Sequence, residues 1–184
     1  MFSRWSKTFA LAFTACAIAM SATTAHADLV VRNDLKHVFD AAGVSGTFVL
    51  MDINADRTYV VDPARAARRI HPASTFKIPN SLIAFDTGAV RDDHEVLPYG
   101  GEPQRFKQWE HDMALPEAIR LSAVPIYQEV ARRVGAERMQ AYVDAFDYGN
   151  RQLGSAIDQF WLVGPMEISA FEEAPADSRS SNCL

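Results

Sequence analysis

Cysteine is nearly absent from this sequence: it has only 2 cysteines in 184 residues. Cys16 lies in the amino-terminal segment and Cys183 is one residue from the carboxyl end. A disulfide framework is therefore excluded, and stability must come from core packing. The 5 histidines are scattered without the spacing of metal ligands. We expect no metal site.

Clustered basic charge and long apolar runs are also lacking. The formal net charge is −5 and no run of Lys or Arg exceeds two residues, so a nucleic-acid-binding surface is not expected. The longest uncharged, mostly apolar stretch is Phe9 to Met20, 12 residues, which is too short to span a bilayer. Hydrophobic residues make up 48% and charged residues 22%, values that exclude disorder, collagen and coiled coils and fit one globular domain.

The first 27 residues have the layout of a secretory signal peptide. Arg4 and Lys7 form a positive head, the apolar stretch follows, and Ala25-His26-Ala27 is a small-x-small cleavage site before Asp28. The sequence predicts a signal peptide over 1–27, a folded domain over 28–174, an atypical polar tail over 175–184, and a periplasmic location without a membrane span.

The remaining pattern changes from strands to helices. A short helix from Asp34 to Gly43, capped by Asp34, precedes strands over 46–53 and 58–61, which form a hairpin. Arg65, Arg68 and Arg69 are expected in a loop. Apolar spacing then predicts helices over 74–86, 116–121, 125–134 and 136–146, and a further one beginning within 167–174.

One short pattern carries chemistry, Ser74-Thr75-Phe76-Lys77. Residues three apart share a helix face, so the Ser74 hydroxyl and the Lys77 amine can come within hydrogen-bond reach. A serine becomes a nucleophile when a base takes its proton, and a lysine can do so if burial keeps it neutral. Taken alone, the pattern favours a solvated Ser and Lys at a helix start.

The wider context favours catalysis. The block from Ser74 to Phe85 resembles the active-site helix of class D (oxacillinase-type) serine β-lactamases. In the order of that family there follow Ser122-Ala123-Val124, Tyr148-Gly149-Asn150 and Phe160-Trp161-Leu162-Val163-Gly164-Pro165. Each short match means little, but the ordered set is specific, and the likeness extends from about Thr47 to Ala174.

The resemblance implies a role for each matched residue. Ser74 would form an acyl-enzyme with a β-lactam such as a penicillin or cephalosporin. Lys77, N-carboxylated by carbon dioxide or bicarbonate, would be the general base, and Ser122 would relay a proton to the leaving nitrogen. No other cofactor is implied. The substrate pocket would be lined by Val124, Tyr148, Gly149, Asn150 and Trp161. Ordinary core packing is the alternative for Val124 and Trp161, and an ordinary turn for 148–150.

The sequence also departs from the family. No Lys-Thr-Gly or Lys-Ser-Gly follows Trp161, although the family has such a strand, which holds the substrate carboxylate and part of the oxyanion hole. The resemblance therefore implies an α+β fold of the serine β-lactamase and transpeptidase type, a helical region plus an antiparallel sheet whose C-terminal strands are missing. The hairpin would have an open edge, with Phe48, Leu50 and Val60 uncovered.

Three functional hypotheses remain. The chain is a class D β-lactamase impaired by truncation, a penicillin-binding sensor or transpeptidase-like domain that is acylated without turnover, or an inactive remnant. The oligomeric state is left open by the sequence.

Overall fold

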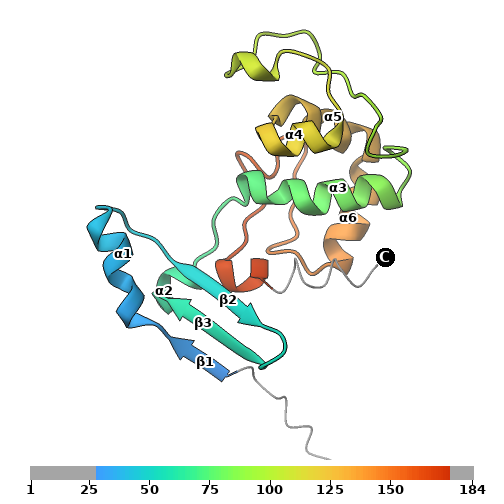
Figure 1. Ribbon diagram of the computed structural model, residues 1–184. Coiled ribbons are helices and arrows are strands. Elements are labelled where there is room, and N and C mark those ends of the chain that lie inside the picture. The colour runs from blue at the N-terminus through green and yellow to red at the C-terminus, as the bar shows by residue number, and fades with distance from the viewer. Residues whose placement is uncertain (1–27, 175–184) are drawn as a thin grey trace, which may run out of the picture.

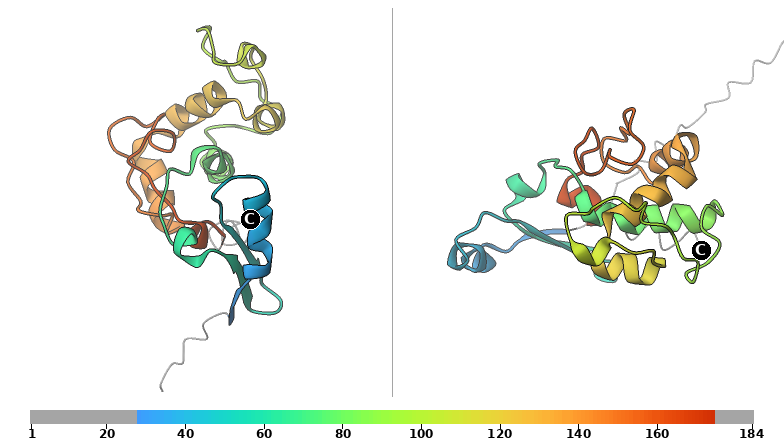
Figure 2. Two further views of the ribbon diagram at one scale, coloured as in Figure 1. Left: turned by 90° about the vertical axis from the view of Figure 1, so that its left-hand side faces the viewer. Right: turned by 90° about the horizontal axis from the view of Figure 1, so that it is seen from above.

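The structure, a computed structural model, describes residues 28–174. The predicted signal peptide over 1–27, the polar tail over 175–184 and Cys183 lie outside the described residues. A small sheet forms one part of the molecule and a group of helices forms the other, and two chain segments join them (Figure 1). Views from the side and from above show the same two parts (Figure 2).

The sheet has three strands, β1 (Asp28–Val31), β2 (Phe48–Asp52) and β3 (Arg57–Val61), in the order β1-β3-β2. The predicted hairpin is confirmed, because β2 and β3 pair antiparallel, with Leu50 opposite Tyr59. The sequence did not predict β1, which pairs parallel with β3. The sheet is therefore mixed rather than purely antiparallel.

The segment between β1 and β2 contains a 3-10 helix, η1 (Asn33–Leu35), and helix α1 (Lys36–Ala41). The predicted capping role of Asp34 is wrong, because Asp34 lies inside η1 and makes no capping bond. Its carboxylate accepts hydrogen bonds of 2.8 and 2.6 Å from the Arg32 guanidinium instead. Asp34 therefore pairs with the Arg32 side chain instead of capping the backbone amides of a helix.

A second expectation is wrong at Arg65, which belongs to helix α2 (Pro63–Ala66) rather than to a loop. Pro63 is suited to the first turn of a helix, because it lacks the amide hydrogen that would be unpaired there. The Asp62 carboxylate caps the helix by accepting a 3.0 Å hydrogen bond from the Arg65 amide. Arg68 and Arg69 follow the helix.

The helical part agrees with the sequence pattern. It contains η2 (Ala73–Phe76), α3 (Lys77–Asp86), η3 (Lys107–Trp109), α4 (Leu115–Leu121), α5 (Val124–Val134) and α6 (Ala136–Ala145). Their apolar faces form the main core, which includes Phe76, Ile126, Val130 and Trp161. The final helix begins at residue 170, after Ile168 has made an antiparallel bridge with Ile70.

The sheet is only partly covered. Phe48 and Leu50 are 48% and 50% exposed, as the sequence led us to expect, whereas Val60 is fully buried. Val60 belongs to the central strand, which has a neighbour on either side. None of the helices within residues 28–174 is long and apolar enough to cross a membrane.

Candidate active site

Ser74 lies in the short 3-10 helix η2, at the entrance to α3. The preceding residue, Ala73, has a left-handed backbone with φ of 51°, which is unfavourable for a residue with a side chain. The Ala73 amide donates a 2.9 Å hydrogen bond to the Trp161 carbonyl. This strained turn, anchored on a distant segment, fixes where the serine side chain lies.

Three polar side chains meet at Ser74. The Lys77 Nζ donates a 3.0 Å hydrogen bond to the Ser74 Oγ, as the spacing of three residues predicts. The Ser122 Oγ lies 2.9 Å from the same Ser74 Oγ. The structure therefore joins a serine, a lysine and a second serine that is 48 positions away in the sequence.

Burial determines the charge state of the lysine. Lys77 is only 2% exposed, and desolvation lowers the pKa of its amine from 10.5 to about 8. Its Nζ lies 5.6 Å from the centre of the Tyr127 ring. No ion pair of Lys77 is found among the described residues. A neutral amine is thus accessible near neutral pH, as a general base requires.

Ser122 is placed by the end of helix α4. It is the residue that closes the helix, with φ of 53° and ψ of 40°. The Trp109 indole donates a 3.0 Å hydrogen bond to the Leu121 carbonyl, which secures this helix end. Val124 follows two residues later as the first residue of α5 and packs against the core.

Trp161 is fully buried, and its ring stacks on Phe76 at a centroid distance of 5.6 Å. Its indole Nε1 is a buried donor for which no acceptor is found among the described residues. An unsatisfied buried donor is unfavourable by roughly 1–3 kcal/mol, so it points to an acceptor other than the described residues.

The turn over 148–150 ties two segments together. Tyr148 is buried, and its ring packs edge-to-face against Phe76 with 5.5 Å between the ring centroids. Its hydroxyl donates a 2.8 Å hydrogen bond to the Glu173 carboxylate. The Asn150 side chain donates to the Pro165 carbonyl at 2.8 Å and accepts from the Glu167 amide at 3.1 Å. These bonds hold the segment that follows Trp161.

Sequence reasoning assigned no catalytic or substrate-binding role to Tyr127 or Phe76. Tyr127 lies beside the Lys77 amine, and its hydroxyl is 2.9 Å from the Ser81 Oγ, one helical turn after Lys77. Phe76 is fully buried between the serine helix and Trp161. A signal for Phe76 was its position inside the Ser-x-x-Lys pattern, where its side chain must point opposite to the nucleophile.

The arrangement contains the parts needed for acyl transfer. A hydroxyl is in contact with an amine whose pKa is lowered, and a second hydroxyl is close enough to pass a proton. Among residues 28–174 no group of three or more His, Cys, Asp or Glu side chains is arranged to hold a metal ion.

Comparison with protein families and with curated proteins identifies relatives of this chain. Residues 46–179 match the penicillin binding protein transpeptidase domain. Among curated proteins, the chain is 43% identical to β-lactamase OXA-10 of Pseudomonas aeruginosa over 157 residues, which are 85% of this chain and 59% of that one. It is 44% identical to β-lactamase OXA-48 of Klebsiella pneumoniae over 128 residues, which are 70% and 48% of the two chains.

Solved structures give the same result. A class D β-lactamase of Fusobacterium nucleatum, FUS-1 (OXA-85), superimposes with a TM-score of 0.74 at 40% identity, covering 78% of this chain and 60% of that one. The BPu1 β-lactamase superimposes with a TM-score of 0.75 at 35% identity, covering 82% and 64% of the two chains. The chain thus spans about half to three fifths of its curated relatives OXA-48 and OXA-10.

Proposed function

Because the chain belongs to the penicillin binding protein transpeptidase domain family and its homologues are class D β-lactamases, we propose that it acts on β-lactams through an acyl-enzyme on Ser74. The observation that carries this proposal is the contact of the Ser74 Oγ with Lys77 at 3.0 Å and with Ser122 at 2.9 Å. The buried lysine and the strained turn before Ser74 support it.

In the proposed reaction, the base at position 77 takes the proton of the Ser74 hydroxyl while the Ser74 Oγ attacks the β-lactam carbonyl. The bond between the carbonyl carbon and the ring nitrogen then breaks. The nitrogen receives a proton through Ser122, whose hydroxyl is already in contact with the nucleophile. A water molecule, deprotonated by the base at position 77, releases the product and frees Ser74.

We further propose that Lys77 is N-carboxylated by carbon dioxide. Two observations fit this modification: the amine is neutral over an accessible pH range, and the buried Trp161 Nε1 lacks an acceptor. The added carboxylate is unprotonated at neutral pH, where an amine with a pKa of about 8 is still mostly protonated. Trp161 would hold it by donating a hydrogen bond. Trp161→Phe, which removes that donor, should lose most bicarbonate-dependent turnover, while the smaller ring should lower the unfolding free energy by only about 1–3 kcal/mol.

Val124, Tyr148, Gly149 and Asn150 are proposed to shape the substrate pocket. Val124 is the first residue of the helix that begins two residues after Ser122, and it packs against the core. The turn over 148–150 contributes by holding the segment after Trp161 in place through its hydrogen bonds.

We also propose export to the periplasm with cleavage before Asp28, in keeping with the charged head and apolar stretch. N-terminal sequencing of secreted protein tests this step, and an intact Met1 would contradict it.

Two reagents measure acylation and hydrolysis separately. A fluorescent penicillin should label the original protein but not Ser74→Ala, and Ser81→Ala, in the helix α3 that follows, serves as a matched control. A chromogenic cephalosporin then measures turnover with and without bicarbonate. Labelling followed by bicarbonate-dependent turnover supports a β-lactamase, whereas stable labelling without turnover identifies an acylated sensor or transpeptidase-like domain. Absence of labelling in a folded protein would contradict the proposal.

A further inference from the structure

Two chain segments lie side by side at the site: one leads to Ser74 and the other contains Trp161. A pair of backbone hydrogen bonds joins Ile70 to Ile168, at 3.0 and 2.8 Å. A further bond runs from the Ala73 amide to the Trp161 carbonyl, at 2.9 Å. The position of the Trp161 indole relative to Ser74 therefore depends on how firmly these two segments are joined.

The backbone hydrogen bonds are interrupted between these two points. Because Ile70 and Ile168 pair antiparallel, the next bonded pair along the ladder is Pro72 with Met166. Pro72 has no amide hydrogen and cannot donate to the Met166 carbonyl. The His71 side chain supplies the bond instead, since its Nδ1 lies 3.1 Å from the Met166 carbonyl oxygen. A carbonyl only accepts, so the Nδ1 carries the hydrogen and donates it.

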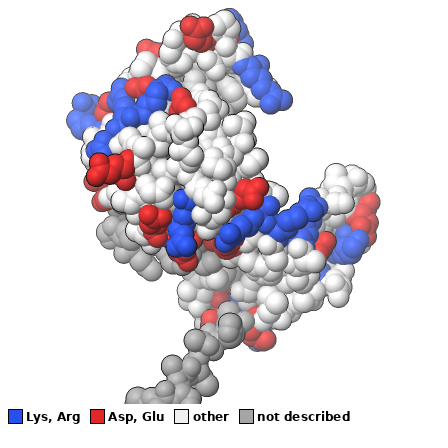
Figure 3. All heavy atoms as spheres, turned by 180° about the vertical axis from the view of Figure 1, so that it is seen from behind, with Lys and Arg blue, Asp and Glu red and all other residues white. Residues whose placement is uncertain are grey.

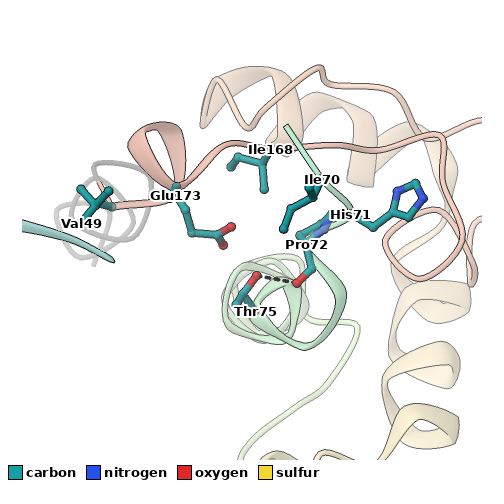
Figure 4. A pocket seen from close by; sticks show the side chains of 9 residues that line it. Val49, Ile70, His71, Pro72, Thr75, Ile168 and Glu173 are labelled. Carbon is teal, nitrogen blue, oxygen red and sulfur yellow. Dashed lines mark hydrogen bonds between the residues drawn. The ribbon is translucent and has the colours of Figure 1, made fainter. Parts of the chain in front are cut away.

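The His71 ring also packs against the backbone of the loop after Trp161. Gly164 has φ of +96°, and a Cβ at this position would lie 2.9 Å from the His71 Cε1. Figure 4 shows the His71 ring turned away from Val49 and Glu173, which line the far side of the adjoining cavity. The ring therefore holds this loop both by packing and by a hydrogen bond.

An ion pair reinforces the outer end of the same junction. Arg69 precedes Ile70 and pairs with Glu172, which follows Ile168. Figure 3 shows acidic and basic side chains next to each other over the region that joins the two parts of the molecule. The pair is partly exposed to solvent, so its contribution is modest. His71 lies on the inner side of Ile70, nearer to the nucleophile in the chain.

We propose that His71 is a positioning residue, which fixes the segment containing Trp161 against the turn before Ser74 and so places the indole Nε1 for the carboxylate on Lys77. This inference rests on the proposed carboxylation of Lys77. The indole donor is buried and has no acceptor among the described residues, so its value depends on where its segment lies. Met166 is also fully buried, and a buried carbonyl that loses its donor favours a displaced backbone. Loss of the His71 bond should therefore weaken carboxylation and leave the nucleophile intact.

Carbon-13 NMR of the complete chain in labelled bicarbonate at constant pH measures carboxylation without a β-lactam. The carbamate signal, followed as bicarbonate is added, gives a half-saturating concentration and a plateau. His71→Leu should raise the half-saturating concentration about three- to tenfold, the size expected for one hydrogen bond, and leave the plateau unchanged. A merely structural role would lower the plateau, because less protein is folded, without moving the half-saturating concentration.

Two further variants at position 71 separate the hydrogen bond from the packing of the ring. His71→Phe keeps a ring against Gly164 but has no donor, so it should behave like His71→Leu. His71→Asn places an amide nitrogen near the position of the Nδ1 and should restore the original half-saturating concentration. His71 is largely exposed, so these side chains can be accommodated.

His37→Leu is the matched control. The His37 Nδ1 also contacts a backbone carbonyl, that of Asp34, at 2.6 Å, but in the segment between β1 and β2. This variant should leave the half-saturating concentration and the plateau unchanged. Amide hydrogen exchange gives a second measurement: His71→Leu should speed exchange of the Ala73 amide, which is bonded to Trp161, and His37→Leu should not.

Several results would overturn the proposal. These are an unchanged half-saturating concentration in folded His71→Leu, a shift that His71→Asn does not reverse, or an equal shift in His37→Leu. Unchanged exchange of the Ala73 amide in His71→Leu would also contradict it. A complete absence of the carbamate signal in the original chain would contradict the proposed carboxylation of Lys77 together with this inference, whereas a signal that His71→Leu leaves unchanged would overturn the inference alone.

Discussion

Replacing Lys77 with methionine should stabilise the protein at neutral pH, because burial disfavours the charged form of the Lys77 amine. The pKa of Lys77 is lowered from 10.5 to about 8 by burial. The difference corresponds to about 3 kcal/mol of unfavourable free energy for the charged form in the folded state. Methionine fills a similar volume without a charge, and it forgoes the hydrogen bond to the Ser74 Oγ. We expect Lys77→Met to raise the free energy of unfolding by about 1–3 kcal/mol at pH 7.

The sign of the pH dependence follows from the same values. Between pH 8 and 10.5 the unfolded chain holds a proton that the folded chain has released, so the stability of the original protein rises with pH in this window. It is constant below pH 8 and above 10.5 as far as this group is concerned. The advantage of Lys77→Met should therefore shrink from pH 8 upward and disappear near pH 10.5.

Urea unfolding in bicarbonate-free buffer at several pH values measures this difference. Lys36→Met is the matched control, because Lys36 is exposed and paired with Asp40 on a helix surface, and its effect should stay within about 0.5 kcal/mol. A Lys77→Met protein that is less stable than the original at pH 7, or a difference that does not change between pH 7 and 10.5, would refute the reasoning.

Two further predictions concern the segment after Trp161. The hydrogen bond from the Arg69 guanidinium is the main reason that the pKa of Glu172 is lowered to about 2, and hydrogen bonds from Ser169 lower it further. The stabilising contribution of the Glu172 carboxylate is therefore present above pH 4.5 and is lost as the pH falls towards 2. Glu172→Gln should lower the free energy of unfolding at pH 7 by about 1 kcal/mol, a modest amount because the ion pair with Arg69 is partly exposed to solvent. The stability of Glu172→Gln should also fall less steeply below pH 4.5, and an unchanged pH dependence in that range would contradict this prediction. Gly149→Ala should cost about 3 kcal/mol or more in thermal unfolding, because φ is +54° and a Cβ would lie 2.2 Å from the Glu167 carbonyl oxygen. Gly88→Ala, with a similar φ of +67° and no atom within 4 Å of a Cβ, should cost only about 1 kcal/mol, and equal losses would show that the close contact is unimportant.

Elements with a regular apolar period were predictable from the sequence. Helix α5 begins within one residue of the predicted start and ends at Val134, because Pro125 and Gly135 mark its limits. The hairpin was predictable for the same reason, since its two strands are joined by a short polar turn. Strand β1 was not, because a parallel pair depends on a partner 29 positions away (Asp28 with Arg57) rather than on a local turn.

The residues of the candidate site also include some that local spacing predicts and some that it does not. Lys77 and Ser74 lie three residues apart, so helix geometry alone brings them together. Ser122 was predicted as a site residue only through resemblance to a family, because no local spacing rule connects it with Ser74. The positive φ of Ala73 and the ring of Tyr127 beside Lys77 depend on contacts between separate segments, and a single sequence contains no pattern for either.

The role of Ser74 as the nucleophile is the central claim, and mapping the attached β-lactam tests it most directly. The purified chain is incubated with benzylpenicillin, quenched in acid after increasing times, digested and analysed by tandem mass spectrometry. We predict a single acylated peptide with the adduct on Ser74, formed faster as the pH rises through 8, where the Lys77 amine becomes neutral. An adduct on Ser122 or another residue, or an unmodified Ser74 in protein that is shown to be folded, would contradict it.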